Sequence, residues 1–382
     1  MNENVRSTPN RVLHVIGAMD RGGAEAFIMN VYRVIDRSQI QFDFLVHEQR
    51  ECDYDTEIEN LGGRIFHIQR LLGPNYLSYT RECRSFFAAH HNYCAVHVHI
   101  GSCAHIVINE AHRYGLFSIA HSHSTDASVS LTDALFKIAT FSTRFLADYF
   151  LACSEQAGVA RFGKSVVSSD RFRVLNNGID TERYRFNLTS RKATRDELGI
   201  DDSTIVLCHV GRFAKEKNHR YLIDVFNKWI QTMPKSILVL VGRGPLEMDI
   251  RQKVESLGLG DKVYFLGVRS DVPGILMAAD LFLFPSIFEG IPIALIEAQA
   301  TGLPCIISDA ISGNARLLPS TICLPIGLDP NKWSELGTQL LTSQQSNNRQ
   351  DCSSSVRECG FDIRDTALEL IRLYSTHQLI GD

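Results

Sequence analysis

The sequence lacks the features that mark secreted, membrane-spanning and nucleic-acid-binding proteins. Its 382 residues include ten cysteines but no CxxC pair, which is typical of reduced thiols in the cytosol. The opening residues MNENVRSTPN contain no apolar core of a signal peptide, and no apolar run reaches the roughly 18 residues that cross a bilayer. With a formal net charge of -4, the chain offers no strongly basic face for nucleic acid. These absences predict a soluble, cytoplasmic protein without a nucleic-acid partner.

Motifs for common cofactors are also missing. No GxxxxGK[ST] phosphate loop occurs, and GRGP at 242–245 lacks the third glycine and the early strand of a dinucleotide fingerprint. The sequence Asp53-Tyr54-Asp55 resembles a metal-binding DxD pair, but it precedes TEIENLGG, where acidic residues suit the start of a helix. We therefore expect neither a resident cofactor nor a metal ion.

Short apolar runs alternate with longer stretches of helical periodicity along most of the chain. RVLHVIG at 11–17 is rich in Val, Ile and Leu and ends in Gly, which is typical of a buried parallel strand. AEAFIMNVYRVI at 24–35 follows it with helical spacing. Further candidate strands are FDFLVH, RIFHI, AVHVHI, FSIAHS and YFLACS in the first half, and TIVLCHVG, SILVLVG, KVYFLG, LFLFP and PCIIS in the second. These repeated units predict an α/β fold of two doubly wound, Rossmann-like domains.

The segment 180–203 interrupts this alternation because it is dense in charge, and we interpret it as a linker. We place the two domains at 1–187 and 188–360, followed by a last amphipathic segment at 361–382. In open α/β sheets, ligands collect beyond the carboxyl ends of the strands. Two such domains facing each other would enclose a central cleft, so the residues that follow each strand are the candidates for chemistry.

Two glutamates lie in the apolar stretch FLFPSIFEGIPIALIEAQATGLP at 282–304. Pro292 suits the first turn of a helix, so Glu289 would lie in the loop before that helix and Glu297 within it. Because helical side chains lean toward the N-terminus, both carboxylates can point to one ligand. The alternative is that Glu289 only complements the helix dipole and that Glu297 faces solvent.

The start of this helix lies between the two carboxylates. Its unpaired backbone N–H groups, around Gly290, Ile291 and Ile293, are suited to an anion. A ligand with hydroxyls at both ends and an anion in the middle would match Glu289, the helix start and Glu297 in turn. A nucleotide diphosphate sugar has this layout.

Cations follow the first strand of the second domain, in HVGRFAKEKNH at 209–219. Arg212 and Lys217 would lie in the loop at the carboxyl end of that strand, where a departing diphosphate needs positive charge. Arg can bind phosphate with two hydrogen bonds, and Lys acts as a compact charge. Lys215 could share the role of Lys217, and a solvated basic turn is the alternative.

These motifs together resemble those of a known enzyme family. Gly211-Arg212 with Lys217-Asn218, followed by PSIFEGIPIALIEAQATGLP with its E-x7-E spacing, is similar to the signature of the retaining GT-B glycosyltransferases of family 4. HVIGAMDRGGAEAFIMNVYR and AHSHST resemble the branch that builds bacterial exopolysaccharides and capsules. The resemblance extends from about residue 11 to the end, with the motifs in the expected order. It implies a metal-independent hexosyltransferase that uses a nucleotide sugar, by analogy a UDP-sugar.

The resemblance also implies roles for residues of the second domain. Arg212 and Lys217 would hold the diphosphate, Glu297 the ribose, and Glu289 would face the transferred sugar. No protein base is evident, so the leaving phosphate would help to deprotonate the acceptor hydroxyl.

Other implied contacts come from loops and from the end of the chain. Gly22 and Gly23 match the family's Gly-Gly loop, where absent side chains let backbone approach the phosphates. The base would lie against the backbone near Val268 and Arg269, and the helix within 361–382 would cross back onto the first domain.

Two pairs of histidines alternate at predicted strand ends, His97 with His99 and His121 with His123. Alternation puts each pair on one face of the sheet. Four histidines could form a zinc site, but no suitably spaced Cys or carboxylate completes it. The resemblance puts one histidine beside the donor sugar; His123 matches best and His121 second, while His97 and His99 are expected to line the cleft or to be buried.

The predicted function is transfer of a sugar from a nucleotide sugar to a glycan or lipid-linked hydroxyl. The alternatives are a sugar-nucleotide epimerase of the same fold, which would act on the donor alone, and a nucleotide-sugar-binding protein without catalysis. Basic residues exceed acidic ones between Arg161 and Arg195. They form either a solvated linker region or a contact with the anionic inner surface of the membrane.

Overall fold

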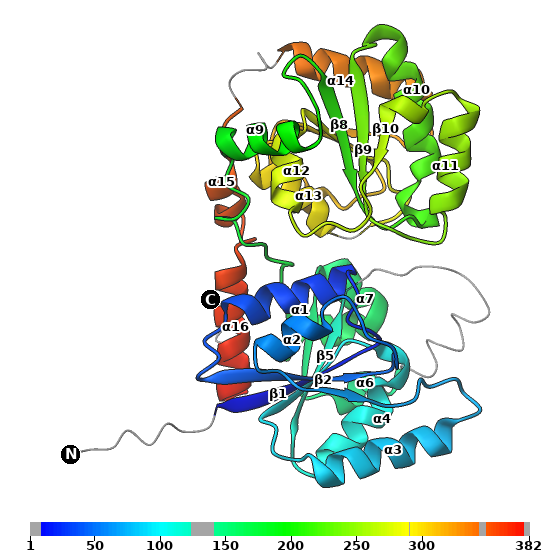
Figure 1. The fold of residues 1–382 in the computed structure, drawn as a ribbon. Coiled ribbons are helices and arrows are strands. Elements are labelled where there is room, and N and C mark those ends of the chain that lie inside the picture. The colour runs from blue at the N-terminus through cyan, green and yellow to red at the C-terminus, as the bar shows by residue number, and fades with distance from the viewer. Residues whose placement is uncertain (1–8, 124–140, 290, 344–348, 378–382) are drawn as a thin grey trace. The chain divides into compact units, whose positions relative to one another are not determined.

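The computed structural model describes residues 9–123, 141–289, 291–343 and 349–377. The chain forms two compact units (Figure 1). Unit 1 comprises Met1–Gly178 together with Ile363–Asp382, and unit 2 comprises Ile179–Asp362. In the order of the chain, unit 2 is therefore an insertion into unit 1.

Unit 1 is built on one parallel sheet. Its strands are β1 (Asn10–Ile16), β2 (Ile40–Val46), β3 (Ile65–His67), β4 (Ala95–Val98), β5 (Phe117–Ser122), β6 (Tyr149–Ala152) and β7 (Phe172–Val174). They pair in the order β3-β2-β1-β4-β5-β6-β7. Its helices are α1 (Gly23–Val34), α2 (Asp55–Asn60), α3 (Tyr76–Ala89), α4 (Gly101–His112), α6 (Thr143–Leu146), α7 (Glu155–Phe162), α8 (Lys164–Val167) and α16 (Ile363–Thr376).

Helices cover both faces of this sheet, which explains why its strands read as continuous apolar runs. Leu13 and Val15 of β1 pack in one cluster with residues of α3 and α4. On the other face, His14 packs against Phe42 and against Tyr374 of α16. Helix α16 also contacts α1, although more than 300 residues separate them in sequence.

Unit 2 is built on a second parallel sheet. Its strands are β8 (Ile205–Val210), β9 (Ser236–Val241), β10 (Val263–Phe265), β11 (Leu281–Phe284), β12 (Cys305–Ser308) and β13 (Thr321–Leu324), in the order β10-β9-β8-β11-β12-β13. Its helices are α9 (Leu188–Glu197), α10 (His219–Thr232), α11 (Glu247–Ser256), α12 (Val272–Ala278), α13 (Ile293–Ala300), α14 (Pro330–Ser343) and α15 (Ser353–Glu358). Three short 3₁₀ segments are η1 (Lys215–Lys217), η2 (Gly260–Lys262) and η3 (Gly313–Ala315).

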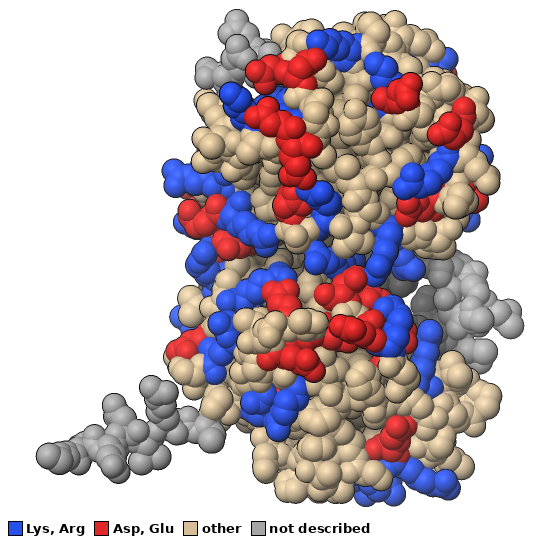
Figure 2. Space-filling model, viewed as in Figure 1, with Lys and Arg blue, Asp and Glu red and all other residues tan. Residues whose placement is uncertain are grey.

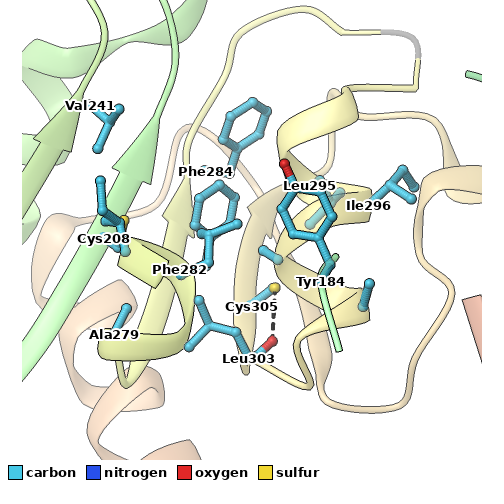
Figure 3. Packing of buried hydrophobic residues seen from close by; sticks show 14 of the residues in the cluster. Tyr184, Cys208, Val241, Ala279, Phe282, Phe284, Leu295, Ile296, Leu303 and Cys305 are labelled. Atoms are coloured by element: carbon cyan, nitrogen blue, oxygen red, sulfur yellow. Dashed lines mark hydrogen bonds between the residues drawn. The ribbon is translucent and has the colours of Figure 1, made fainter. Parts of the chain in front are cut away.

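The core of unit 2 lies between its strands and helices. Figure 3 shows Phe282 and Phe284 of β11 beside Leu295 and Ile296 of α13, which belong to one buried cluster. In both sheets the first strand lies between the second and the fourth, which is the doubly wound order. The prediction of two Rossmann-like doubly wound sheets is confirmed.

The interpretation of 180–203 as a linker is wrong. Helix α9 occupies Leu188–Glu197, and its Arg195 is 2% exposed. Arg191 and Arg195 both donate to the carbonyl of Ala278, the last residue of α12, and both bind Asp280. The charge that resembled a solvated linker therefore satisfies the carboxyl end of another helix.

Two strands were not predicted, β7 and β13. Each is only three or four residues long and lies at an edge of its sheet. In β7 an arginine, Arg173, separates the apolar residues Phe172 and Val174. A run this short gives no periodicity that would distinguish a strand from a loop.

Positive and negative side chains are mixed over much of the face shown in Figure 2. This mixture agrees with the small net charge of the chain. In the described ranges, no helix has both the length and the apolar character that crossing a bilayer requires.

Candidate functional site

The site in unit 2 lies where the strand order reverses, between β8 and β11. Ligands of doubly wound sheets bind beyond the carboxyl ends of the strands at this point. The loop after β8 contains η1 and the loop after β11 contains Glu289. A hydrogen bond of 2.8 Å, in which Ile287 N donates to Glu216 O, joins the two loops.

Lys217 and Glu289 form an ion pair across these loops. Both side chains are only 16% exposed, and Lys217 Nζ lies 4.8 Å from the ring centroid of Phe284. Asn218 follows with a φ of 54°, which turns the chain from η1 into α10. The predicted cation and the predicted sugar-facing carboxylate are thus brought together, and an anionic ligand would compete with Glu289 for the ammonium group.

The other predicted cations are arranged differently. Arg212 directly follows Gly211 at the end of β8, and its side chain is exposed. Lys215 is also exposed, whereas Lys217 is half-buried and paired. The surroundings therefore favour Lys217 over Lys215 as the fixed charge, and they leave Arg212 accessible to a ligand.

Close backbone contact holds the end of β8 against the end of β9. Gly242 has a φ of 134°, and a Cβ placed on it would lie 2.2 Å from the carbonyl oxygen of Gly211. Its N–H donates to Gly267 O at 2.8 Å. Only glycine allows this approach, which fixes the backbone from which Arg212 projects.

Glu297 lies in the second turn of α13 and is hydrogen-bonded rather than solvent-facing. The hydroxyl of Tyr184 donates to Glu297 Oε1 at 2.5 Å, and Tyr184 is 7% exposed. Burial raises the pKa of Glu297, while the Tyr184 hydrogen bond and the charge of Arg183 oppose that rise. The carboxylate keeps a second oxygen for a ligand.

Helix α13 begins at Ile293, with Pro292 in the preceding cap position. The first N–H groups of a helix have no partner within it, and here Ile293 provides one of them. Leu295 N donates back to Pro292 O at 3.1 Å. Ile291 is buried, and Gly290 lies outside the described residues.

The expected base-binding residues follow β10. Val268 is 36% exposed. The guanidinium of Arg269 donates to Asp271 at 2.6 and 2.7 Å and to Glu197 at 2.7 Å. Two carboxylates bind the side chain of Arg269. A contact with the nucleotide base would therefore have to come from the backbone of Arg269, which is the contact that we predicted.

In unit 1, Gly22 and Gly23 form the start of α1, which follows β1 at the point where that sheet reverses its strand order. A Cβ on Gly23 would have no neighbour within 4 Å among the described atoms. The backbone at Gly23 is therefore open to a ligand, whereas a Cβ on Gly22 would lie 2.2 Å from a carboxylate oxygen of Glu25. By contrast, Asp55 of the DxD sequence lies in the first turn of α2, as expected for an acidic residue at a helix start, and it accepts a hydrogen bond from Cys52 N at 2.8 Å.

The predicted histidines form a connected cluster at the ends of β4 and β5. His99 Nδ1 lies 2.7 Å from His123 Nε2, and His97 Nε2 lies 3.1 Å from His121 Nδ1. His97 also contacts the Tyr374 hydroxyl at 2.8 Å. His97 is fully buried, which was one of the two environments expected for it.

One member of this cluster was missed, His14 of β1. It is paired in register with His97, and its Nδ1 lies 3.0 Å from His99 Nε2. Its only signal in the sequence was its place inside a predicted strand. Burial lowers the pKa of His14 and of His123 to about 3, so the imidazoles are neutral at physiological pH.

The cluster contains enough histidine nitrogens to coordinate a transition-metal ion. His99, His121 and His123 each offer a nitrogen within 4.8 Å of the others. Most of these nitrogens already pair with one another, however, and no carboxylate or thiolate joins them in the groups found among the described residues. The contacts between rings orient the imidazoles. Three buried ring nitrogens of the cluster, His14 Nε2, His121 Nε2 and His123 Nδ1, have no hydrogen-bond partner among the described residues.

Comparison with known proteins agrees with this geometry. Residues 190–358 match the family described as Glycosyl transferases group 1, and residues 21–183 match Glycosyltransferase Family 4. The chain is 32% identical to EpsF of Bacillus subtilis (strain 168) over 381 residues, which covers 97% of this chain and 98% of EpsF. It is 36% identical over 151 residues, 39% of each chain, to a UDP-Gal:alpha-D-GlcNAc-diphosphoundecaprenol alpha-1,3-galactosyltransferase of Escherichia coli.

Solved structures share the whole fold. Anabaena Alr3699/HepE, crystallised with UDP and glucose, superimposes with a TM-score of 0.78 at 18% identity, covering 96% of this chain and 99% of that one. WaaG, a glycosyltransferase involved in lipopolysaccharide biosynthesis, gives a TM-score of 0.71 at 17% identity, covering 95% and 99%. With a relative aligned along nearly its full length and two sheets of the GT-B type, the chain belongs to glycosyltransferase family 4 and is a nucleotide-sugar-dependent glycosyltransferase.

Proposed function

We propose that this enzyme transfers a sugar from a UDP-sugar to a hydroxyl of a glycan or a lipid-linked oligosaccharide. The transfer would retain the anomeric configuration, need no metal ion and serve the synthesis of an exopolysaccharide or capsule. The observation that carries the proposal is the half-buried Lys217 at the strand-order reversal of unit 2, with Arg212 exposed nearby in sequence. A fixed ammonium and a guanidinium there can replace the metal ion that other transferases use.

The roles of the residues follow from their surroundings. Lys217 and Arg212 would neutralise the charge that develops on the diphosphate as the bond between the anomeric carbon and the phosphate oxygen breaks. The new glycosidic bond forms from the acceptor oxygen, and the acceptor proton passes to the departing phosphate oxygen. Glu289, freed from Lys217 by the diphosphate, would bind hydroxyls of the transferred sugar, and Glu297 would bind the ribose.

Other residues would complete donor binding. The start of α13, at Gly290, Ile291 and Ile293, would donate backbone N–H groups, and Val268 and Arg269 would line the base. Gly22, Gly23 and His123 of unit 1 would contact the phosphates and the sugar. The Nε2 of His123 lies 2.7 Å from His99 Nδ1, while its Nδ1 has no hydrogen-bond partner among the described residues.

The nature of donor and acceptor is argued from relatives. HepE was solved with UDP and glucose, and the Escherichia coli relative is named for UDP-galactose and a diphosphoundecaprenol-linked acceptor. A lipid-linked acceptor would place this enzyme at the cytoplasmic face of the membrane, as a peripheral protein.

The test is substitution of Lys217 with a matched neighbour as control. Lys217→Gln should lower kcat about 100-fold or more, because removing one fixed donor from a developing oxyanion has an effect of that size. Lys215→Gln removes the same charge two residues away and should leave kcat within about twofold, since Lys215 is exposed. Arg212→Gln should resemble Lys217→Gln.

Equal turnover by Lys217→Gln and the native enzyme would contradict the proposed roles. Incubation with UDP-sugars alone should leave the sugar configuration unchanged. Conversion of the donor without an acceptor would instead identify an epimerase. Thermal stabilisation by a panel of nucleotide sugars, measured on the native protein, identifies the donor before any acceptor is known.

A further inference from the structure

A cavity of about 480 Å³ lies in unit 1, away from the residues assigned to catalysis. It is formed by α6, the end of α7, α8 and the start of β7. The residues that line it are Arg144, Phe145, Phe162, Gly163, Lys164, Ser165, Val166, Ser169 and Arg171. Its volume is within the range of sites that bind small ligands.

Three cations line this cavity without a counter-charge. Those cations are Arg144, Lys164 and Arg171, and no ion pair between these three residues and a carboxylate is found in the described part of the chain. Lys164 and Arg171 are exposed, and Arg171 donates to the carbonyl of Ala147 at 3.3 Å. Arg144 Nε is buried and has no hydrogen-bond partner there. The three positive charges face one hollow, so an anion inside it would be attracted by all of them.

The backbone at the cavity is shaped to bring these cations close. Gly163 has a φ of 85°, and a Cβ on it would lie 3.2 Å from a guanidinium nitrogen of Arg144. The residue that joins α7 to α8 thus leaves room for the guanidinium. Ser165 and Ser169 add hydroxyl groups of the kind that hydrogen-bond phosphate oxygens.

Apolar side chains flank the same cavity and are exposed. Phe145 is 70% exposed and Phe141 is 50% exposed, with their ring centroids 5.5 Å apart. The guanidinium of Arg144 lies over the Phe141 ring, 4.1 Å from its centroid. Exposed aromatic rings beside cations are typical of segments that lie in the interfacial layer of a membrane.

We propose that this cavity binds the phosphate headgroup of an anionic membrane lipid, with Phe141 and Phe145 inserted into the interfacial layer around it. A soluble diphosphate would match the cations but would leave both rings in water. A lipid headgroup satisfies the charge and covers the rings at once. The proposal deepens the peripheral membrane location proposed above and rests on it. It can fail separately from the sugar transfer, because vesicle binding needs no donor.

The experiment measures binding of the full chain to vesicles of phosphatidylcholine with and without phosphatidic acid. Binding should require phosphatidic acid. Arg144→Gln, Lys164→Gln and Arg171→Gln should each weaken it about fivefold, since one cation near an anionic surface has roughly that effect. Phe145→Ser should weaken it about tenfold by removing the inserted ring. Arg81→Gln on α3, an exposed arginine outside the cavity, is the matched control and should change nothing.

Inorganic pyrophosphate separates a lipid site from a soluble-anion site. If the ligand is a lipid, Phe145→Ser should lose vesicle binding while keeping the native affinity for pyrophosphate. Equal binding to neutral vesicles would overturn the proposal, and so would an equal loss with Arg81→Gln. Tight pyrophosphate binding without any vesicle binding would also overturn it, because the site would then serve a soluble anion.

Discussion

At the scale of single residues, the ion pair between Lys217 and Glu289 is the most informative contact in unit 2. Without ligand, each charge neutralises the other in a half-buried place, where an unpaired charge would be costly. A diphosphate would take over the ammonium and leave the carboxylate for sugar hydroxyls. One contact would thus keep both groups in position before the donor arrives.

Tyr184 is a positioning residue for Glu297, and Tyr184→Phe tests this role. A hydrogen bond to a charged group contributes about 1.5–3 kcal/mol, so the KM for the donor should rise about tenfold or more while kcat stays nearly unchanged. Because the hydroxyl opposes the rise in the pKa of Glu297, its removal should raise that pKa further. The acid limb of donor binding should then move to higher pH.

Steady-state kinetics across the acid range measure both effects. Tyr264→Phe is a suitable control, since Tyr264 is a half-buried tyrosine of β10 in the same unit. A mutant of Tyr184 with the native KM and the native pH profile would show that the hydroxyl only fills space. A loss confined to thermal stability would lead to the same conclusion.

At this scale the sequence predicted individual groups but not their partners. The spacing of Glu289 and Glu297 placed one before a helix and one inside it, as the structure has them. Nothing in the sequence indicated that Lys217 pairs with Glu289, or that Tyr184 reaches Glu297 across 113 residues. Such pairs depend on how loops from separate strands meet, which periodicity does not describe.

At the scale of secondary structure, two arginines of α9 hydrogen-bond the carbonyl groups at the C-terminal end of α12. Arg195 donates to the carbonyls of Ala278 and Asp201, both at 2.8 Å, and also binds Thr204 O. These acceptors come from three different segments of unit 2. A single buried guanidinium therefore connects α9, the end of α12 and the approach to β8.

Arg195→Met should destabilise unit 2 by about 3–5 kcal/mol, because the carbonyls and Asp280 would lose a buried positive partner. Urea unfolding followed by circular dichroism measures the change. Lys192→Met on the exposed side of the same helix should alter stability by less than about 0.5 kcal/mol. A small effect of Arg195→Met would mean that water replaces the guanidinium.

The helices and strands were largely predictable, and the exceptions share a cause. Long apolar runs such as β1 and β8 are buried on both faces, so composition alone identifies them. Helix α9 was mistaken for a linker because its arginines are used internally. The edge strands β7 and β13 were missed because tertiary pairing, rather than an apolar run, makes them strands.

At the scale of the whole molecule, the histidine cluster makes stability depend on pH. His14, His97 and His121 are at most 3% exposed, and burial lowers the pKa of each well below the 6.5 of an unfolded imidazole. Below about pH 6.5 the unfolded chain binds protons that the folded chain does not. The stabilisation is therefore fully present above that pH and is lost as the pH falls.

Each such histidine changes the free energy of unfolding by up to about 1.4 kcal/mol per pH unit, so three give roughly 4 kcal/mol per unit. Against a total of about 5–15 kcal/mol, this slope should bring a measurable loss of the stability of unit 1 as the pH falls below about 6.5. Chemical unfolding between about pH 7 and pH 5 measures the slope. His14→Leu should lower the slope by the amount that corresponds to one bound proton, whereas His91→Gln, on the surface, should leave the slope unchanged. Equal slopes for the native protein and both variants would contradict the burial of neutral histidines.

The insertion of unit 2 into unit 1 also affects how the protein is made. Tyr374 of α16 packs against His14 on one face of a sheet whose first strand begins at Asn10. A ribosome adding about 5–20 residues per second would synthesise all of Ile179–Asp362 before that helix emerges, a delay of about 10–40 s. The first half to leave the ribosome is therefore the last to finish folding, and during that interval its uncovered face is a natural target for chaperones.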